Sequence, residues 1–345
     1  MSEHDGSGPP ATALKLHALA YGMGIAAALS AAVRLGLPDA LGEEPASVGE
    51  LARAVEADPG ALRQLLLALS CREVFREAGE DRFEHTGMSR LLRAGEPGGK
   101  RDMVLLASAP FAWDIWSRLE QAVRTGESVF PGLYGKGLFA YLVEDAPELG
   151  ALFNRAMAGS GALVNKAVVT SLDLAGVEHV ADVGGGAGRT LRALLEHDGG
   201  LHGTLVDLPP VVAEADPGLR ANGAFADRCE LVGCDVTEEL PVQADLYLIK
   251  HVVHMWDDDT ALRALRTVAR RARPGSRVVL AEQLLDAGPS PEVTTTMGLL
   301  MLVSQGGRER TGAELRALLE RAGLRCTGIR PTGTQVHLVE AVVEK

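Results

Sequence analysis

The chain has 345 residues, which is enough for two domains of ordinary size. Its 46 acidic and 34 basic residues give a formal net charge of −12. This excess argues against generic binding to nucleic acids or anionic membranes, because both require a basic surface. Residues 1–10 are polar and rich in glycine and proline, so we expect a disordered tail there. The four cysteines, without Cys-x-x-Cys spacing, indicate a cytoplasmic protein with neither a disulfide framework nor a zinc site: Cys71, Cys229, Cys234 and Cys326.

The segment 11–100 is predicted to be mostly helical. The apolar stretch Thr12–Leu35 predicts a long helix, and its polar interruptions favour a buried or dimer-forming helix over a membrane span. Ser47-Val48-Gly49-Glu50 has the spacing of a capping box, and Asp58-Pro59 is a typical start of the next helix. Residues 75–83 then predict a short β-hairpin. This order of helix, helix and hairpin is the outline of a winged helix-turn-helix.

A winged helix permits two interpretations. A DNA-binding regulator needs polar and basic side chains on its second helix. The second helix expected here, Asp58 to Ser70, offers only Arg63 and Gln64 among apolar residues. We therefore expect the segment 11–100 to be a dimerisation module, with a ligand-sensing DNA-binding regulator as the less favoured alternative.

Residues 101–170 are again predicted to be helical and carry much of the sparse aromatic content. Core packing explains any single ring in this segment. A cluster so local also fits the lining of a pocket for a flat apolar ligand, with Trp113, Trp116 and Phe139 as its candidate rings.

After Gly176 the pattern changes to short apolar runs that alternate with helical segments. This alternation predicts an α/β fold with a doubly wound, Rossmann-like sheet of seven strands. The last two runs are joined by so short a turn that they must be antiparallel. The seven runs are His179–Val183, Thr204–Val206, Glu230–Val232, Leu246–Ile249, Val278–Ala281, Cys326–Arg330 and Val336–Val343.

The segment Asp182–Gly188 reads Asp-x-Gly-x-Gly-x-Gly and joins a predicted strand to a predicted helix. Glycines allow a tight turn and a close approach of the backbone to a ligand. The spacing fits neither the dinucleotide fingerprint nor the Walker pattern, so the loop suits a ligand without phosphates. Asp207 ends the next strand, where an acid can accept both hydroxyls of a ribose, and Asp235 follows the third strand, where it can meet an adenine.

On these motifs, residues 11–345 resemble the two-domain S-adenosylmethionine-dependent O-methyltransferases of plant phenolics and bacterial natural products. The resemblance implies a homodimer formed through residues 11–100 and a cofactor-binding catalytic domain over 101–345. It also implies S-adenosyl-L-methionine as cofactor, with contacts spread over the strand ends. Those contacts are Gly184, Gly186, Asp207, Asp235, Val236 and Lys250. Many relatives have Met or Phe at the position of Val236, which is a departure from the family pattern.

The segment Ile249–Asp258 contains the candidate base. A phenol has a pKa near 10, so methyl transfer to it requires a base, and histidine suits that role. His254 stands where the family has its base, and His251 is the less favoured candidate. Glu282 and Glu309 match the family's two acids that orient the base, although Glu309 also fits a charge at a helix N-terminus.

We expect no metal, because Asp257-Asp258-Asp259 is typical of a helix start and catechol-type, magnesium-dependent enzymes lack the N-terminal module. The sequence thus predicts O-methylation of an aromatic, polycyclic specialised metabolite, with C- or N-methylation as the alternative. The acceptor pocket is expected to use Trp113, Trp116 and Phe139 on one side and Leu299, Leu300 and Val303 on the other.

Overall fold

The computed structural model describes residues 9–344, and the chain divides into two compact units. The first unit comprises Met1–Trp113 and Ala151–Ser160, and the second comprises Asp114–Gly150 and Gly161–Lys345. Of the expected N-terminal tail, residues 1–8 lie outside the described residues, whereas Pro9 and Pro10 begin helix α1.

The first unit consists of short helices and a three-stranded sheet with the order β1-β3-β2. Its elements are α1 (Pro9–Ala20), α2 (Gly22–Arg34), α3 (Leu37–Ala40), β1 (Ala46–Ser47), α4 (Val48–Ala54), α5 (Pro59–Ser70), β2 (Phe75–Glu77), β3 (Arg82–His85), α6 (Gly87–Arg90) and α7 (Arg101–Ala107). Helices α8 (Pro110–Trp116) and α12 (Pro147–Ser171) cross the boundaries between the units.

The single long helix expected over Thr12–Leu35 is wrong, because the chain breaks at Tyr21 and bends by 48° between α1 and α2. Glycine lowers helix stability, and Gly22 and Gly24 follow the break directly. Among the described residues no single helix is long and apolar enough to cross a membrane, and only the bent α1–α2 pair passes that test when both parts are counted.

The local signals in the first unit are confirmed. The Glu50 N–H donates to Ser47 Oγ at 3.2 Å and the Ser47 N–H donates to the Glu50 carboxylate at 2.8 Å, which completes the capping box. Strands β2 and β3 pair antiparallel as a hairpin. Arg63, the one basic residue of α5, forms an ion pair with Asp81 at 2.9 Å, so its charge is already partnered within this unit.

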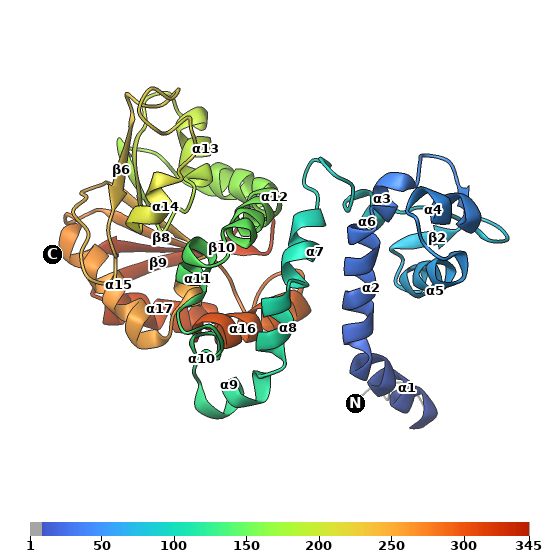
Figure 1. The fold of residues 1–345 in the computed structure, drawn as a ribbon. Helices are drawn as coiled ribbons and strands as arrows, with labels where there is room; N and C mark the ends of the chain where they lie inside the picture. Colours follow the sequence, from blue (N-terminus) through green and yellow to red (C-terminus); the bar gives the residue numbers. More distant parts are fainter. Residues whose placement is uncertain (1–8, 345) are drawn as a thin grey trace, which may run out of the picture. The chain divides into compact units, whose positions relative to one another are not determined.

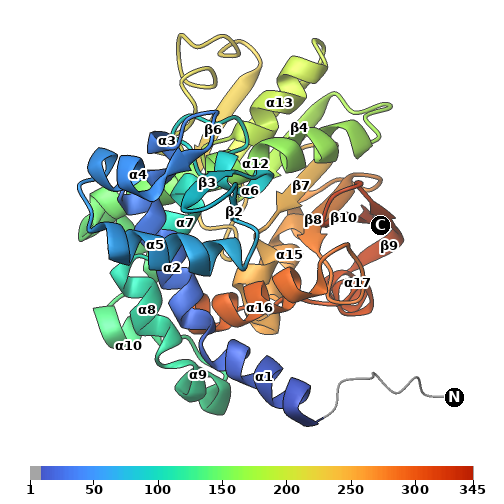
Figure 2. The ribbon, with the colours of Figure 1, turned by 90° about the vertical axis from the view of Figure 1, so that its right-hand side faces the viewer.

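The second unit contains a seven-stranded sheet with the order β6-β5-β4-β7-β8-β10-β9 (Figure 2). The last strand, β10, is antiparallel to both of its neighbours and the other pairs are parallel, as predicted. The strands are β4 (His179–Val183), β5 (His202–Asp207), β6 (Cys229–Gly233), β7 (Leu246–Lys250), β8 (Arg277–Gln283), β9 (Leu324–Pro331) and β10 (Val336–Val343). The helices are α9 (Leu119–Thr125), α10 (Phe130–Tyr134), α11 (Leu138–Glu144), α13 (Arg189–His197), α14 (Pro209–Ala213), η1 (Val253–Met255, a 3₁₀ turn), α15 (Asp258–Arg271), α16 (Pro291–Gln305) and α17 (Gly312–Arg321).

Helices cover both faces of this sheet, and alternating strand residues divide between two cores (Figure 1). In β7, for example, Tyr247 and Ile249 join the core under α15 and α17, while Leu246 and Leu248 join the core under α13 and the end of α12. Successive side chains of a strand point to opposite faces, so strands buried on both faces read as continuous apolar runs.

The strand order places the functional segments at one edge. Strands β4 and β7 are neighbours, although β5 and β6 lie between them in sequence, so the direction of winding reverses at this point. Ligands of open α/β sheets bind outside the carboxyl ends of the strands at such a reversal. The segments 184–188, 207–209, 234–236 and 250–256 all follow carboxyl ends of these parallel strands.

Candidate active site

The glycines of the loop after β4 differ in the room they leave for a side chain. Gly184 has a φ of +69°, and a Cβ there would lie 2.6 Å from the Val252 side chain. Gly186 has a φ of +60°, but a Cβ there would meet nothing within 4 Å. The first glycine is therefore required for packing, whereas the second leaves open space above the loop. Backbone in this conformation can approach a ligand closely.

Asp207 links the end of β5 to the glycine loop. The Gly186 N–H donates to Asp207 Oδ2 and the Leu208 N–H donates to Asp207 Oδ1, both at 2.8 Å. Burial raises the pKa of Asp207, and these two hydrogen bonds oppose that effect. Each carboxylate oxygen has a second lone pair, so Asp207 can also accept hydroxyl groups.

Asp235 and Val236 follow β6, as expected. Asp235 is exposed and accepts hydrogen bonds from the Thr237 N–H at 2.8 Å and from the Thr237 hydroxyl at 2.7 Å. Val236 is buried in the core on one face of the sheet. Its side chain thus contributes to the core, which explains why an apolar residue of this size stands there.

Asp182, near the end of β4, is buried, and Lys250, at the end of the neighbouring strand β7, is half-buried. Burial raises the pKa of Asp182 to about 6 and lowers the pKa of Lys250, and the charge of each group opposes the shift of the other. Asp182 Oδ2 is buried without a hydrogen-bond partner in the described part of the chain. Unpaired buried polar atoms are costly, so this acid is suited to binding a polar or cationic group of a ligand.

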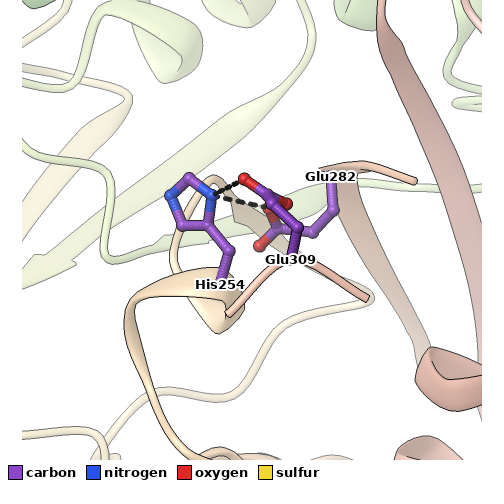
Figure 3. Close-up of side chains that lie close together, drawn as sticks. All are labelled: His254, Glu282 and Glu309. Carbon is purple, nitrogen blue, oxygen red and sulfur yellow. Dashed lines mark hydrogen bonds and ion pairs between the residues drawn. The ribbon is translucent and has the colours of Figure 1, made fainter. Parts of the chain in front are cut away.

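His254, Glu282 and Glu309 meet at the site (Figure 3). His254 lies on the turn η1 after β7, Glu282 near the end of β8 and Glu309 before α17. His254 Nδ1 lies 2.8 Å from Glu309 Oε1 and 3.9 Å from Glu282 Oε2. Glu282 Oε1 accepts the backbone N–H groups of Val252 and Val253 at 3.0 and 2.9 Å, which ties this acid to the turn itself.

The two acids control the protonation of the imidazole. Burial alone would lower the pKa of His254, but the charge of Glu282 and the hydrogen bond to Glu309 outweigh it and raise the pKa. Burial raises the pKa of Glu282. A carboxylate at Nδ1 favours the tautomer with its proton on Nδ1, which leaves the Nε2 lone pair free to accept a proton.

The alternative interpretation of Glu309 as a helix N-terminal charge is wrong. The N-cap of α17 is Thr311, and its capping box partner is Glu314. Asp257, by contrast, is the N-cap of α15 and accepts the Thr260 N–H, as expected for that acidic run.

Two residues that the sequence did not single out hold the turn of His254. Arg310 is 2% exposed, and its guanidinium donates to the carbonyl oxygens of Val253 and Trp256, each at 2.8 Å. A Cβ at Gly307 would lie 2.2 Å from the His254 carbonyl oxygen. The signal in the sequence was a Gly-Gly-Arg-Glu-Arg run, in which glycines beside charged residues indicate backbone packed closely against another segment.

His251 lies beside His254. Its ring is stacked on that of His254 with centroids 5.6 Å apart, and its backbone has a φ of +54°. Burial lowers the pKa of His251 well below its usual value. A histidine that resists protonation and lacks a carboxylate partner is a weaker candidate base than His254.

The residues expected to line an acceptor pocket have different environments. In the second unit, helix α16 packs against α9, α10 and η1, which places Leu299, Leu300 and Val303 on a helix beside the turn that carries His254. Leu299 is 40% exposed and Val303 is fully buried. Trp116 and Phe139 are half-buried in the second unit, and Trp113 is half-buried in the first, where its indole N–H donates to the Ser108 carbonyl oxygen.

The group of His254, Glu282 and Glu309 also has the composition of a metal site, with one potential ligand atom of each within 4.8 Å of the others. A metal ion on Nδ1 would have to replace the hydrogen bond to Glu309. The observed 2.8 Å contact is a hydrogen bond, and the expectation of no metal stays a prediction.

Comparison with known proteins places this geometry in a family. A family model described as the O-methyltransferase domain matches residues 116–325, and one described as the O-methyltransferase dimerisation domain matches residues 18–95. The mitomycin biosynthesis 6-O-methyltransferase of Streptomyces lavendulae is 38% identical over 317 residues, which are 91% of this chain and 90% of that protein.

Comparison with solved structures gives the same family. The mitomycin 7-O-methyltransferase MmcR aligns with a TM-score of 0.85 at 38% identity, over 97% of this chain and 98% of that one. NcsB1 from neocarzinostatin biosynthesis, solved with S-adenosylmethionine and 2-hydroxy-5-methyl naphthoic acid, aligns with a TM-score of 0.75 at 31% identity, over 92% and 95% of the two chains. The resemblance read from the motifs is thereby confirmed, and the chain belongs to the S-adenosylmethionine-dependent O-methyltransferase family with an N-terminal dimerisation domain.

Proposed function

We propose that this O-methyltransferase methylates a hydroxyl group of an aromatic, polycyclic natural product, with His254 as the general base. One observation carries the proposal. His254 Nδ1 is hydrogen-bonded to the buried Glu309 at 2.8 Å, beside a second buried acid, Glu282. This arrangement suits a proton acceptor that must become an imidazolium inside the protein.

The cofactor-binding residues are proposed from the geometry of the strand ends. The backbone of Gly184 and Gly186 approaches the cofactor closely, and Asp207 accepts hydrogen bonds from its ribose hydroxyls. The buried Asp182 and the half-buried Lys250 are charged groups on the strands beside the glycine loop, and Lys250 would bind the methionine carboxylate. The orphaned Asp182 Oδ2 and the open space above Gly186 support this assignment. Asp235 and Val236 would flank the adenine.

The reaction requires a deprotonated acceptor. The bound cofactor supplies an electrophilic methyl group on its sulfonium. His254 Nε2 removes the proton of the acceptor hydroxyl, since Nδ1 already carries the proton that is donated to Glu309. Glu309 and Glu282 stabilise the imidazolium that forms. The protein also contributes by orienting the hydroxyl in line with the transferred methyl group.

The aromatic nature of the acceptor is proposed from two observations. NcsB1, a relative, was solved with a naphthoic acid. In this chain, the helix α16 beside the base presents Leu299 and Leu300 without a charged residue between them and Val303. Apolar side chains with few polar groups are typical of pockets for flat ligands. We assign Trp116 and Phe139 of the same unit to the same role, and the part expected of Trp113 stays a prediction from the sequence.

The experiment has two steps. Calorimetry with S-adenosylmethionine alone tests the cofactor, and absence of binding would refute the proposed cofactor residues. A methylation screen over hydroxylated naphthoates, phenazines and quinones, read by mass spectrometry, then identifies the acceptor and locates the methyl group on oxygen, carbon or nitrogen. With that acceptor, His254→Ala should reduce kcat by about 10²- to 10⁴-fold while cofactor affinity is retained.

We also propose a homodimer formed through the N-terminal module. Helices α1 and α2 expose five large apolar side chains, each at least 65% accessible: Leu14, Leu16, Leu19, Tyr21 and Met23. Contiguous exposed apolar residues mark interaction surfaces. The match to a dimerisation domain supports a second copy as the partner. Sedimentation equilibrium should give twice the chain mass of 36.3 kDa, and a monomer would contradict the proposal.

A further inference from the structure

We infer that Arg310 is a positioning residue for the base, because its guanidinium fixes the backbone turn that carries His254. The inference rests on the proposed role of His254 and extends it to a residue that contacts neither the acceptor nor the cofactor in the proposed mechanism. Arg310 adjoins Glu309 in sequence, so one short segment holds both the ring and the backbone of His254.

Every N–H of the Arg310 guanidinium is used. Nη1 donates to the carbonyl oxygens of Val253 at 2.8 Å and Arg308 at 3.3 Å. Nη2 donates to the Trp256 carbonyl oxygen and to Asp258 Oδ1, each at 2.8 Å, and Nε donates to Asp258 Oδ1 at 3.0 Å. The two carbonyls of Val253 and Trp256 lie on opposite sides of His254 in sequence, so a single planar group spans the turn.

The contacts of Arg310 are specific for arginine. The guanidinium has five N–H donors in a rigid fork, whereas the ammonium of lysine has three around a single atom. Lysine would preserve the positive charge but cannot reach both carbonyl oxygens and Asp258 with the same geometry. Because the side chain is 1% exposed, water cannot replace the lost donors, and the turn must move.

Movement of this turn acts directly on the base. Gly307 already touches the backbone of His254 and Met255 at distances that exclude a Cβ, so the turn is confined from this side as well. The distance of 2.8 Å between His254 Nδ1 and Glu309 Oε1 is therefore set by two contacts on one segment. A displacement of about 1 Å in a reacting group lowers rates by roughly 100-fold.

Charged and titratable groups surround His254 from each neighbouring element. Glu282 comes from β8, Glu309 and Arg310 from the segment before α17, and His251 from the turn after β7, while the charge of Lys250 acts on His251. The charge of Arg310 itself lowers the pKa of His254, so a neutral substitution would mix two effects. Arg310→Lys retains the charge and changes mainly the geometry.

Arg308 offers a matched control. It also donates to Asp258, at 3.1 and 3.2 Å, and to Glu314, but to neither carbonyl of the turn. Arg308→Lys thus makes the same chemical change beside the same aspartate. We expect Arg310→Lys to lower kcat about 10- to 100-fold with unchanged affinity for S-adenosylmethionine, and Arg308→Lys to leave kcat near that of the wild type.

The ring itself provides a readout that does not depend on catalysis. In the full-length protein labelled with ¹⁵N-histidine, the Nδ1–H proton of His254 should give a downfield NMR resonance, assigned by its loss in His254→Ala. Arg310→Lys should weaken or remove this resonance, and the acid limb of kcat/KM should move to lower pH as the bond to Glu309 loosens. Arg308→Lys should change neither.

The outcomes distinguish the positioning role of Arg310 from the proposed role of His254 as the base. An unchanged resonance and kcat in folded Arg310→Lys would overturn the inference, as would equal losses of kcat in both lysine variants. If Arg310→Lys does not fold, Asp258→Asn replaces it, since it weakens two of the Arg310 contacts at a side chain that is 40% exposed. It also weakens the contacts of Arg308 with Asp258, so it is compared with Arg308→Lys, and an unchanged resonance and kcat in Asp258→Asn would overturn the inference. Wild-type turnover by His254→Ala would instead refute the proposed base, while the resonance would still test whether Arg310 fixes the turn.

Discussion

Glu309→Gln is the sharpest test of the proposed base. The carboxylate is 2% exposed and lies 2.8 Å from His254 Nδ1. The amide has the same shape but no charge, and it can turn its NH₂ group toward Nδ1. That orientation would favour the tautomer with its proton on Nε2, which cannot accept a proton from the acceptor.

The expected magnitude follows from the contact. A hydrogen bond to a charged group contributes roughly 1.5–3 kcal/mol, and each 1.36 kcal/mol of barrier changes the rate tenfold. Glu309→Gln should therefore lower kcat about 10- to 150-fold. The KM for S-adenosylmethionine should not change, because among the described residues Glu309 is hydrogen-bonded to His254 and to none of the residues assigned to the cofactor. The assay is steady-state turnover of the acceptor that the screen identifies.

Glu282→Gln is the matched comparison. Its amide oxygen can still accept the N–H groups of Val252 and Val253, and the hydrogen bond between His254 and Glu309 remains. Glu282 Oε2 lies 3.9 Å from Nδ1, so only a longer-range charge effect is lost. This variant should retain more kcat than Glu309→Gln. Wild-type kcat in Glu309→Gln, with the fold intact by circular dichroism, would refute the reasoning.

Three further predictions follow from the same contacts. Because the pKa of His254 is raised and the base must be unprotonated, the acid limb of kcat/KM should have its midpoint above 6.5, and a limb below 6.5 in a pH–rate profile would contradict this. Asp207→Ala removes the acceptor of the Gly186 and Leu208 N–H groups, so calorimetry should show affinity for S-adenosylmethionine weakened about 10-fold or more; unchanged affinity would place the ribose elsewhere. Gly307→Ala should lower both thermal stability and kcat, because its Cβ would lie 2.2 Å from the His254 carbonyl oxygen, and a wild-type melting temperature in calorimetry would show that the segment is free to move.

Local patterns in the sequence predicted much of the fold. The capping box at Ser47 and the hairpin after Phe75 depend on neighbours within a few residues, and both are confirmed. The seven apolar runs were visible because strands buried on both faces carry no polar alternation. The break at Tyr21 was missed, because apolar composition continues across it and only two glycines mark the bend.

The candidate residues were named one by one, and the family resemblance implied that Glu282 and Glu309 lie beside His254, but their contacts were visible only in the structure. His254 stood in a motif matched to a family, and Glu309 lies 55 residues further along the chain. Nothing within either segment distinguished an acid that orients a base from an acid that stabilises a helix start. The structure shows that Thr311 and Glu314 form the cap, and that Glu309 is hydrogen-bonded to His254 instead.

The sequence by itself determined the family, the order of strands and helices along the chain, and the acids that follow or end β5 and β6. Each of these features depends on a short segment of sequence. Only the tertiary structure showed how the turn that carries His254, the proposed base, is held in place. Arg310 meets the turn at Val253 and Trp256 across more than fifty residues of chain, and it is buried where a charge persists only when all its donors are paired. Such a contact depends on how β7, β8 and the segment before α17 pack together, and no local pattern contains that information.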